Sequence, residues 1–206
     1  MINLHRPFGP YILECMCPDD VLKNFNDFVD SGKYIKDANT PDMLGRGFEL
    51  VYFTRNKLDD IGFTNFISNS AKEYLKQYEN YDVKNAVICY MDTSFSPVFA
   101  DVWVNRYFKG NYTPPHYHGG HISGITLLDL PEESDQHDLH SLEFMWSNEI
   151  YHPLQVTGKT FLFDSKLKHW VKTQRCVSER RTLSFNLMVY FQKNGIMEKW
   201  RPEPIL

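Results

Sequence analysis

The chain has 206 residues, of which 42% are hydrophobic, 15% aromatic and 23% charged, and its formal net charge is −4. This composition is typical of a globular protein with a sizeable, β-rich core. The acidic balance argues against a nucleic-acid-binding surface, which needs a basic stripe. No apolar run is long enough for a transmembrane helix.

The N-terminal part is predicted to hold two amphipathic helices. Tyr11–Leu13 is a candidate first strand. Pro18 and the aspartates after it then begin a helix, because proline fits the first helical turn and acidic residues suit its positive end. Apolar residues recur with helical spacing until Ser31-Gly32. Thr64 is the predicted N-cap of a second helix, which runs to about Gln77 after a loop-rich segment.

The four cysteines are Cys15, Cys17, Cys89 and Cys176, and no secretory signal precedes them. Such spacing is typical of reduced thiols, so we expect a cytoplasmic protein. Cys15 and Cys17 are close enough to share a metal ion, but no second pair faces them.

From about residue 86 the sequence changes to short β-prone runs separated by turn signals. The predicted strands are Val87–Met91, Val98–Phe108, Ile122–Leu130, Leu139–Trp146, Thr160–Phe163, His169–Thr173 and Arg180–Phe191. Strands that follow helices in this way predict a mainly β sandwich or barrel with helices packed on one face. We expect one domain over 1–206, with helical support over about 1–85 and the β core over about 86–192.

Three histidines, His116, His118 and His121, lie within six residues between two of these runs. Side chains two apart on an extended backbone point to the same face, so His116 and His118 can bind one metal ion. Neutral imidazole is a common ligand for iron, zinc, copper and nickel. His169, at the start of a late strand, offers a third ligand, although alone it would count as an ordinary histidine. His121 is expected beside the site or exposed.

The last predicted strand has a polar and an apolar face. The polar face is Arg180, Thr182, Ser184 and Asn186, and the apolar face is Leu183, Phe185, Leu187 and Val189. We expect the apolar face to pack on the helices and the polar face to point toward the histidines. A buried arginine needs an anion, and a bound carboxylate could accept from Arg180 and Thr182. Alternatively, Arg180 pairs with an internal acidic residue or lies outside the barrel.

Trp103, Asn105 and Tyr107 share one face of an earlier strand. They are candidates to line a cosubstrate or substrate pocket, but the two aromatic residues could equally be core residues. The acidic segment Pro131–His140 is interpreted as a solvated loop, with a lid or substrate contact as the alternative.

The run Tyr107-x-x-Gly110-x-x-Thr113-x-Pro115-His116-x-His118 resembles the iron(II)/2-oxoglutarate oxygenases, in their prolyl-hydroxylase-like branch. That family has a basic residue eleven positions after its distal histidine, as Arg180 stands after His169. A wider pattern resembles short oxygenases of bacteria and phages. It comprises Trp103-Val104-Asn105, His116-Tyr117-His118, Ser123-Gly124, His169 and Ser184-Phe185-Asn186.

The resemblance implies a double-stranded β-helix, which is a jelly-roll, cupin-like barrel. It also implies an enzyme that binds iron(II) through His116, His118 and His169. Such an enzyme couples the decarboxylation of 2-oxoglutarate, with dioxygen, to hydroxylation of a substrate, and it releases succinate and carbon dioxide. One departure is that His118 stands where most of the superfamily has a carboxylate. Three imidazoles leave bound iron(II) at a net charge of +2 rather than +1.

The resemblance further implies that 2-oxoglutarate binds through Arg180 and Thr182, near Asn105, Tyr107 and Thr113. Thr113 replaces a tyrosine that often contacts the cosubstrate in prolyl hydroxylases.

Two other classes of protein remain open. The spacing from Gly110 to His116-x-His118 also resembles the first cupin motif, without its following glutamate, so a cupin-like metal-binding protein is possible. A catalytically silent barrel acting as an interaction module is the other. Substrate specificity is expected to depend on the loops over 131–140 and 39–57. The sequence leaves open the substrate and whether the chain forms a homo-oligomer.

Overall fold

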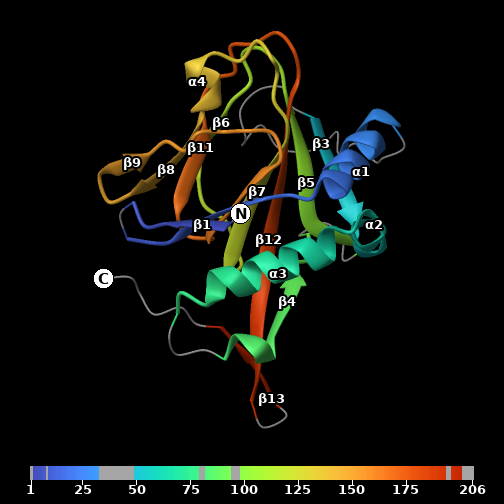
Figure 1. Cartoon of the computed structure of the whole chain (residues 1–206), viewed down its shortest axis with the longest axis vertical. Helices are drawn as coiled ribbons and strands as arrows, with labels where there is room; N and C mark the ends of the chain where they lie inside the picture. The colour runs from blue at the N-terminus through green and yellow to red at the C-terminus, as the bar shows by residue number, and fades with distance from the viewer. Residues whose placement is uncertain are drawn as a thin grey trace.

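The structure is a computed structural model that describes residues 2–7, 9–32, 49–78, 82–93, 98–193 and 196–200 (Figure 1). Its first elements are β1 (Ile2–His5), β2 (Ile12–Met16), α1 (Asp19–Asp30), β3 (Glu49–Thr54), α2 (Arg55–Ile61), α3 (Phe63–Leu75), the 3-10 helix η2 (Val83–Asn85) and β4 (Ala86–Tyr90). There follow β5 (Phe99–Tyr107), β6 (Thr113–His116), β7 (Ile122–Asp129), α4 (Gln136–Leu139), β8 (Leu142–Trp146), β9 (Glu149–Tyr151), β10 (Lys159–Asp164), β11 (Lys168–Val171), β12 (Arg180–Lys193) and β13 (Ile196–Lys199).

The strands form two antiparallel sheets. The larger sheet has the order β1-β2-β10-β7-β12-β5-β3, with β4 and β13 also paired to β12, and the smaller has the order β6-β11-β8-β9. Buried side chains from both sheets, among them Phe144, Phe161 and Phe163, pack together between them. This arrangement confirms the mainly β prediction.

The helices cover the other face of the larger sheet. α1 buries Val21, Phe25 and Val29 on one side, as its apolar spacing predicts. The Phe25 ring packs edge-to-face on Phe53 and on Phe63 of α3, with centroid distances of 5.2 and 5.1 Å. Each fully buried phenylalanine contributes about 1.5–3 kcal/mol, so these rings are a main attachment of the helices.

β12 crosses the middle of the larger sheet, between β5 and β7, and separates two environments. Leu183, Phe185 and Leu187 lie in the helix-side core, and the Phe185 ring is 5.3 Å from that of Phe63. Gly124 on β7 makes room for Phe185, because a Cβ there would lie 2.1 Å from the ring. The alternate residues of β12 point to the opposite face, as the sequence predicts.

The predicted start of the second helix, with Thr64 as its N-cap, is wrong. Two helices, α2 and α3, occupy this region, and they meet at Gly62, whose φ of 89° lies in the left-handed region that favours glycine. Thr64 therefore lies inside α3 and is not its N-cap, and its hydroxyl donates to the Asp59 carboxylate.

All seven predicted strands are present, but the prediction missed five others: β1, β3, β6, β9 and β13. The start of the predicted strand at Leu139 is wrong, because Leu139 ends the short helix α4. The loop-rich segment is also shorter than expected, since β3 and α2 occupy its end. Most of the predicted specificity segment 39–57 lies outside the described residues.

No helix in the described ranges is long and apolar enough to cross a membrane. All four cysteines are free thiols, and of these Cys89 is exposed. Cys15 and Cys17 join no group of metal-binding side chains among the described residues, so the shared metal site is not supported.

Candidate metal and carboxylate site

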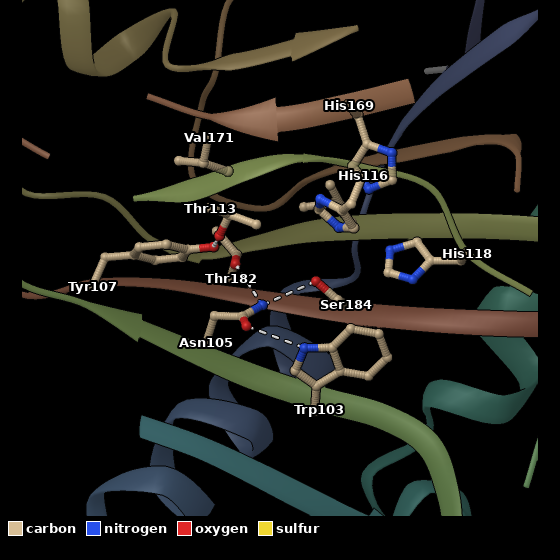
Figure 2. A pocket seen from close by; sticks show the side chains of 11 residues that line it. Trp103, Asn105, Tyr107, Thr113, His116, His118, His169, Val171, Thr182 and Ser184 are labelled. Atoms are coloured by element: carbon tan, nitrogen blue, oxygen red, sulfur yellow. Dashed lines mark hydrogen bonds between the residues drawn. The ribbon is translucent and has the colours of Figure 1, made fainter. Parts of the chain in front are cut away.

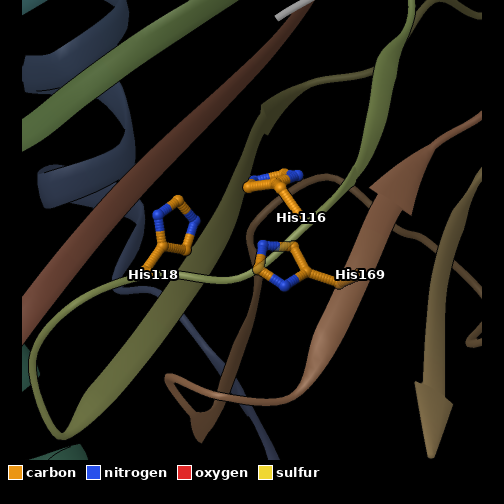
Figure 3. A group of neighbouring side chains, drawn as sticks. All are labelled: His116, His118 and His169. Atoms are coloured by element: carbon orange, nitrogen blue, oxygen red, sulfur yellow. The ribbon is translucent and has the colours of Figure 1, made fainter. Parts of the chain in front are cut away.

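Three histidine side chains meet between the two sheets (Figure 3). His116 ends β6 and pairs directly with His169 of β11, while His118 lies two residues beyond the strand. The ring centroids are 4.4 Å apart for His116 and His169, 4.8 Å for His116 and His118, and 5.1 Å for His118 and His169. One nitrogen of each ring lies within 4.8 Å of the others. We call these three residues the histidine triad.

Hydrogen bonds fix the orientation of two of these rings. The Nδ1 atoms of His116 and His169 lie 2.8 and 2.9 Å from the carbonyl oxygens of Pro114 and Leu167. A carbonyl can only accept, so Nδ1 carries the proton in both rings. Each Nε2 atom therefore keeps a free lone pair, which is the state that a metal ligand requires.

All three rings of the histidine triad are neutral at pH 7. Burial lowers the pKa of His116, and burial together with the neighbouring His116 and Lys166 lowers that of His118 to about 3. His169 is fully enclosed, and burial holds its pKa well below the usual value. The protein thus holds three unprotonated imidazoles close together, where protonation of more than one would be strongly unfavourable.

His121 lies apart from the histidine triad. Its Nδ1 accepts the backbone N–H of Val189 at 2.9 Å, and its ring packs 5.8 Å from that of Trp200. The lone pair of Nδ1 is thus used within the protein, which agrees with the expectation that His121 is not a ligand.

A cavity of about 50 Å³ lies beside the histidine triad (Figure 2). Its lining comprises Trp103, Asn105, Tyr107, Thr113, His116, His118, Ile125, His169, Val171, Thr182 and Ser184. Trp103, Ser184, His116 and His118 are only partly buried, whereas the other lining residues are buried. The cavity therefore opens at the end where Trp103 and His118 lie and is closed at the end where Tyr107 lies.

Polar side chains on β5 and β12 are joined across the floor of this cavity. The Trp103 indole N–H donates to Asn105 Oδ1 at 3.1 Å. Asn105 Nδ2 in turn donates to Thr182 Oγ1 at 3.3 Å and to Ser184 Oγ at 3.0 Å, as Figure 2 shows. Because Thr182 accepts this bond, its own O–H is left to donate to another group.

Tyr107 and Thr113 close the inner end of the cavity. Their hydroxyl oxygens lie 2.7 Å apart, and burial raises the pKa of the Tyr107 phenol, which therefore stays protonated. Tyr107 also belongs to the packed core between the sheets, so both interpretations of this residue hold.

Arg180, the first residue of β12, is 1% exposed and lies over the Tyr107 ring, with Cζ 5.6 Å from the centroid. Its Nη atoms donate to Ser141 Oγ and Gln155 Oε1, and its Nε has no partner. Both acceptors are neutral, so neither alternative for Arg180 holds: it is inside the barrel and bonds to no acidic side chain among the described residues. Burial lowers its pKa to about 10, although Tyr107 and Asp138 act in the opposite direction.

A second group of potential metal ligands consists of Asp135, His137 and Asp138, around α4. The two carboxylates of this group already accept hydrogen bonds within the protein. Asp135 accepts the Asp138 N–H as the cap of α4. The Asp138 carboxylate accepts the N–H groups of Arg175 and Cys176 and the Cys176 thiol.

The structure brings together all eight residues that the sequence singled out for metal and cosubstrate binding: the histidine triad with Asn105, Tyr107, Thr113, Arg180 and Thr182. The sequence prediction missed Ser141 and Gln155, which hold Arg180. Neither belongs to a motif, and they meet Arg180 only through the packing of distant segments, so nothing in the sequence pattern could have indicated them.

Comparison with known proteins gives one family match. Residues 101–186 match the family described as "Putative 2OG-Fe(II) oxygenase". No curated protein matches the sequence at a significant level.

Several solved structures share the fold. A prolyl-4-hydroxylase from Pseudomonas putida has a TM-score of 0.58 at 12% identity, over 88% of this chain and 92% of that one. A prolyl hydroxylase from Trichoplax adhaerens, in complex with a hypoxia inducible factor peptide fragment, has a TM-score of 0.52 at 16% identity, over 84% and 83%. The non-heme alpha-ketoglutarate-dependent epimerase SnoN, from nogalamycin biosynthesis, has a TM-score of 0.61 at 10% identity, over 90% and 81%. These matches confirm the predicted double-stranded β-helix.

Proposed function

We propose, from the match of residues 101–186 to the 2OG-Fe(II) oxygenase family, that the chain is a dioxygenase that hydroxylates a substrate and converts 2-oxoglutarate to succinate and carbon dioxide. One observation carries the proposal. Three neutral imidazoles line a cavity, and a buried guanidinium whose partners are all neutral lies over Tyr107, which lines the same cavity. The first set suits a metal ion, and the second suits a carboxylate.

Iron(II) would be held by His116, His118 and His169. The donor chemistry fits, because the rings are neutral and their Nδ1–H bonds keep the Nε2 atoms of His116 and His169 available. The bound ion would supply the activation of dioxygen and the oxidation of 2-oxoglutarate. No acidic side chain belongs to the histidine triad, so the site would keep the full +2 charge of iron(II). That charge favours a dianionic cosubstrate over a neutral one.

The far carboxylate of 2-oxoglutarate would bind Arg180 and Thr182. Support comes from the unbonded Nε of Arg180, because a buried donor without a partner costs about 1–3 kcal/mol. Thr182 has a hydroxyl proton to donate, since its oxygen already accepts from Asn105. Tyr107, whose phenol interacts with Thr113 and Thr182, would border the carboxylate at the same end.

The remaining lining residues would exclude water and direct the substrate. The inner end, around Tyr107 and Thr113, is buried, so a cosubstrate there would be shielded from solvent. The substrate would approach from the open end, where the Trp103 ring lies 5.7 Å from His118. A cavity of about 50 Å³ holds only a few water molecules. Admission of a five-carbon dicarboxylate therefore requires the lining side chains to move apart.

We also propose that the domain extends beyond the matched segment, over 1–206. β2 and β3 pair with β10 and β5 and so complete the larger sheet. The core around Phe25 and Phe63 then depends on N-terminal residues.

Release of succinate from 2-oxoglutarate by iron-loaded protein tests the proposal. Arg180→Ala and His169→Ala should each abolish it, while Arg175→Ala, at an exposed arginine, should leave it unchanged. Equal succinate release by the Arg180→Ala protein would show that Arg180 does not bind the cosubstrate.

Measurements of iron and 2-oxoglutarate binding separate the two other classes of protein. A cupin-like metal-binding protein would use the histidine triad but has no role for the buried Arg180, so it would bind iron and not 2-oxoglutarate. A catalytically silent barrel would hold neither, and metal analysis of protein purified without added iron would detect this.

A further inference from the structure

The acidic loop 131–140 lies directly against the partners of Arg180, although its own residues do not line the cavity. Within it, α4 lies above the ends of β6 and β11 (Figure 1). The main-chain carbonyl of Asp138 accepts from Ser141 Oγ at 2.8 Å and from Gln155 Nε2 at 3.4 Å. These two side chains are the ones that bind Arg180.

The contacts with Asp138 fix which atoms of Ser141 and Gln155 face Arg180. The Ser141 hydroxyl uses its only proton on the Asp138 carbonyl, so its lone pairs are left for the guanidinium. Gln155 places its Nε2 group on the same carbonyl and on Ser141 Oγ, so its Oε1 must face Arg180. A rotated Gln155 amide would set two donors against each other at Arg180 and two acceptors against each other at the Asp138 carbonyl, so the observed orientation is the stable one.

The side chain of Asp138 holds the chain segment that leads into β12. Its carboxylate accepts the N–H of Arg175 at 3.0 Å, the N–H of Cys176 at 3.2 Å and the Cys176 thiol at 2.9 Å. Asp138 is 3% exposed and Cys176 is 7% exposed, so these bonds are shielded from water. One residue thus ties α4 both to the side chains that hold Arg180 and to the turn before it.

Neutral acceptors leave the charge of Arg180 available. A guanidinium has five N–H groups, and Ser141 and Gln155 account for two of them. An acidic residue at either position would form an ion pair and compete with an incoming carboxylate. Amide and hydroxyl acceptors fix the plane of the guanidinium without neutralising it.

We propose, resting on the function above, that Asp138 is a positioning residue. Through Ser141 and Gln155 it orients Arg180 for the far carboxylate of the cosubstrate, and the loop 131–140 supports the cosubstrate pocket. This role differs from both expectations for the loop, which were a solvated connection and a substrate lid.

Calorimetric titration of the iron(II)-loaded protein without oxygen tests the proposal with two ligands. 2-Oxoglutarate carries both the chelating end and the far carboxylate, whereas oxalate keeps only the chelating oxygens. Asp138→Asn keeps the main-chain carbonyl but weakens the carboxylate bonds to Arg175 and Cys176, so the segment before β12 should shift. The poorer alignment of Arg180 should weaken 2-oxoglutarate binding about 10-fold. It should leave the affinity for oxalate within about twofold, because the histidine triad is untouched.

Gln155→Glu is the sharper variant, because it converts a neutral partner of Arg180 into a charged one. The ion pair with Arg180 offsets the lost Nε2 bonds to the Asp138 carbonyl and Ser141 Oγ, so we expect little change in melting temperature, while the 2-oxoglutarate affinity falls at least about 10-fold. If Gln155 were only structural, the melting temperature and the 2-oxoglutarate affinity would fall together. Gln136→Glu adds the same charge at an exposed position of α4 and should change neither.

The outcomes distinguish this proposal from the proposed function. If the unaltered protein does not bind 2-oxoglutarate, the proposed function fails and this inference falls with it. If Arg180→Met abolishes binding while Asp138→Asn and Gln155→Glu bind like the unaltered protein, only the positioning role is refuted. An equal loss of oxalate and 2-oxoglutarate binding would also refute it, because the damage would then be general.

Discussion

Replacing Arg180 by methionine should separate folding stability from cosubstrate binding. Burial lowers the pKa of this guanidinium to about 10. At about 1.4 kcal/mol per pKa unit, keeping the charge inside costs folding roughly 3 kcal/mol. The substitution removes that cost but leaves the acceptors of Ser141 and Gln155 without a donor, at about 1–3 kcal/mol each. These effects oppose each other, so the free energy of unfolding should fall by no more than about 3 kcal/mol.

Binding should respond very differently. A buried, charge-assisted pair with a carboxylate is worth about 3 kcal/mol, so Arg180→Met should weaken 2-oxoglutarate binding by roughly 100-fold or more. Denaturant unfolding of metal-free protein and calorimetry of iron-loaded protein measure the two quantities. Arg175→Met, at an exposed arginine, should leave both nearly unchanged. A destabilisation above about 4 kcal/mol would mean that Arg180 is mainly structural, and unchanged binding would remove it from the pocket.

Three further predictions concern the buried histidines, the packing at Gly124 and the accessibility of the thiols. Metal-free protein should lose stability as the pH falls from about 6.5 to 5, because unfolded imidazoles then take up protons that His118 and His169 cannot. His118 alone, with a pKa of about 3, should account for about 2 kcal/mol at pH 5, and identical denaturation curves at pH 7 and 5 would contradict this. Gly124→Ala should cost about 3 kcal/mol of unfolding free energy, because the new Cβ would overlap the Phe185 ring, and adding Phe185→Leu should recover part of it. A thiol reagent should label Cys89 alone of the four cysteines in folded protein, and rapid labelling of a second thiol would mean that the core opens more readily than its burial indicates.

The sequence was most informative where a short-range pattern and burial act together. The alternation along β12 predicted which residues face the helices and which face the histidines, because a strand sends alternate side chains to opposite faces. His116 and His118 were paired by the same rule, although His118 lies beyond the end of β6. His169 was a candidate third ligand from its place in a late strand, and the family resemblance supported that choice, since spacing alone does not determine which strands become neighbours.

The prediction failed where tertiary contacts decide local structure. β6 contains Pro114 and Pro115, which disfavour strands, yet it forms at the edge of the smaller sheet, where missing N–H donors are tolerated. Thr64 has the character of an N-cap, but Gly62 takes the left-handed conformation that starts α3. The sequence did not predict the partners of Arg180, because Ser141 and Gln155 approach it only in the folded chain.

The central claim is that the histidine triad binds iron beside a pocket for the cosubstrate carboxylate. A crystal structure of the protein with iron(II) and 2-oxoglutarate, prepared without oxygen and measured at the iron absorption edge, tests it most directly. We predict one strong anomalous peak at bonding distance from a nitrogen of His116, His118 and His169, with density for the dicarboxylate extending to Arg180. An iron peak at Asp135, His137 and Asp138 instead, or no peak at the histidine triad, would contradict the claim.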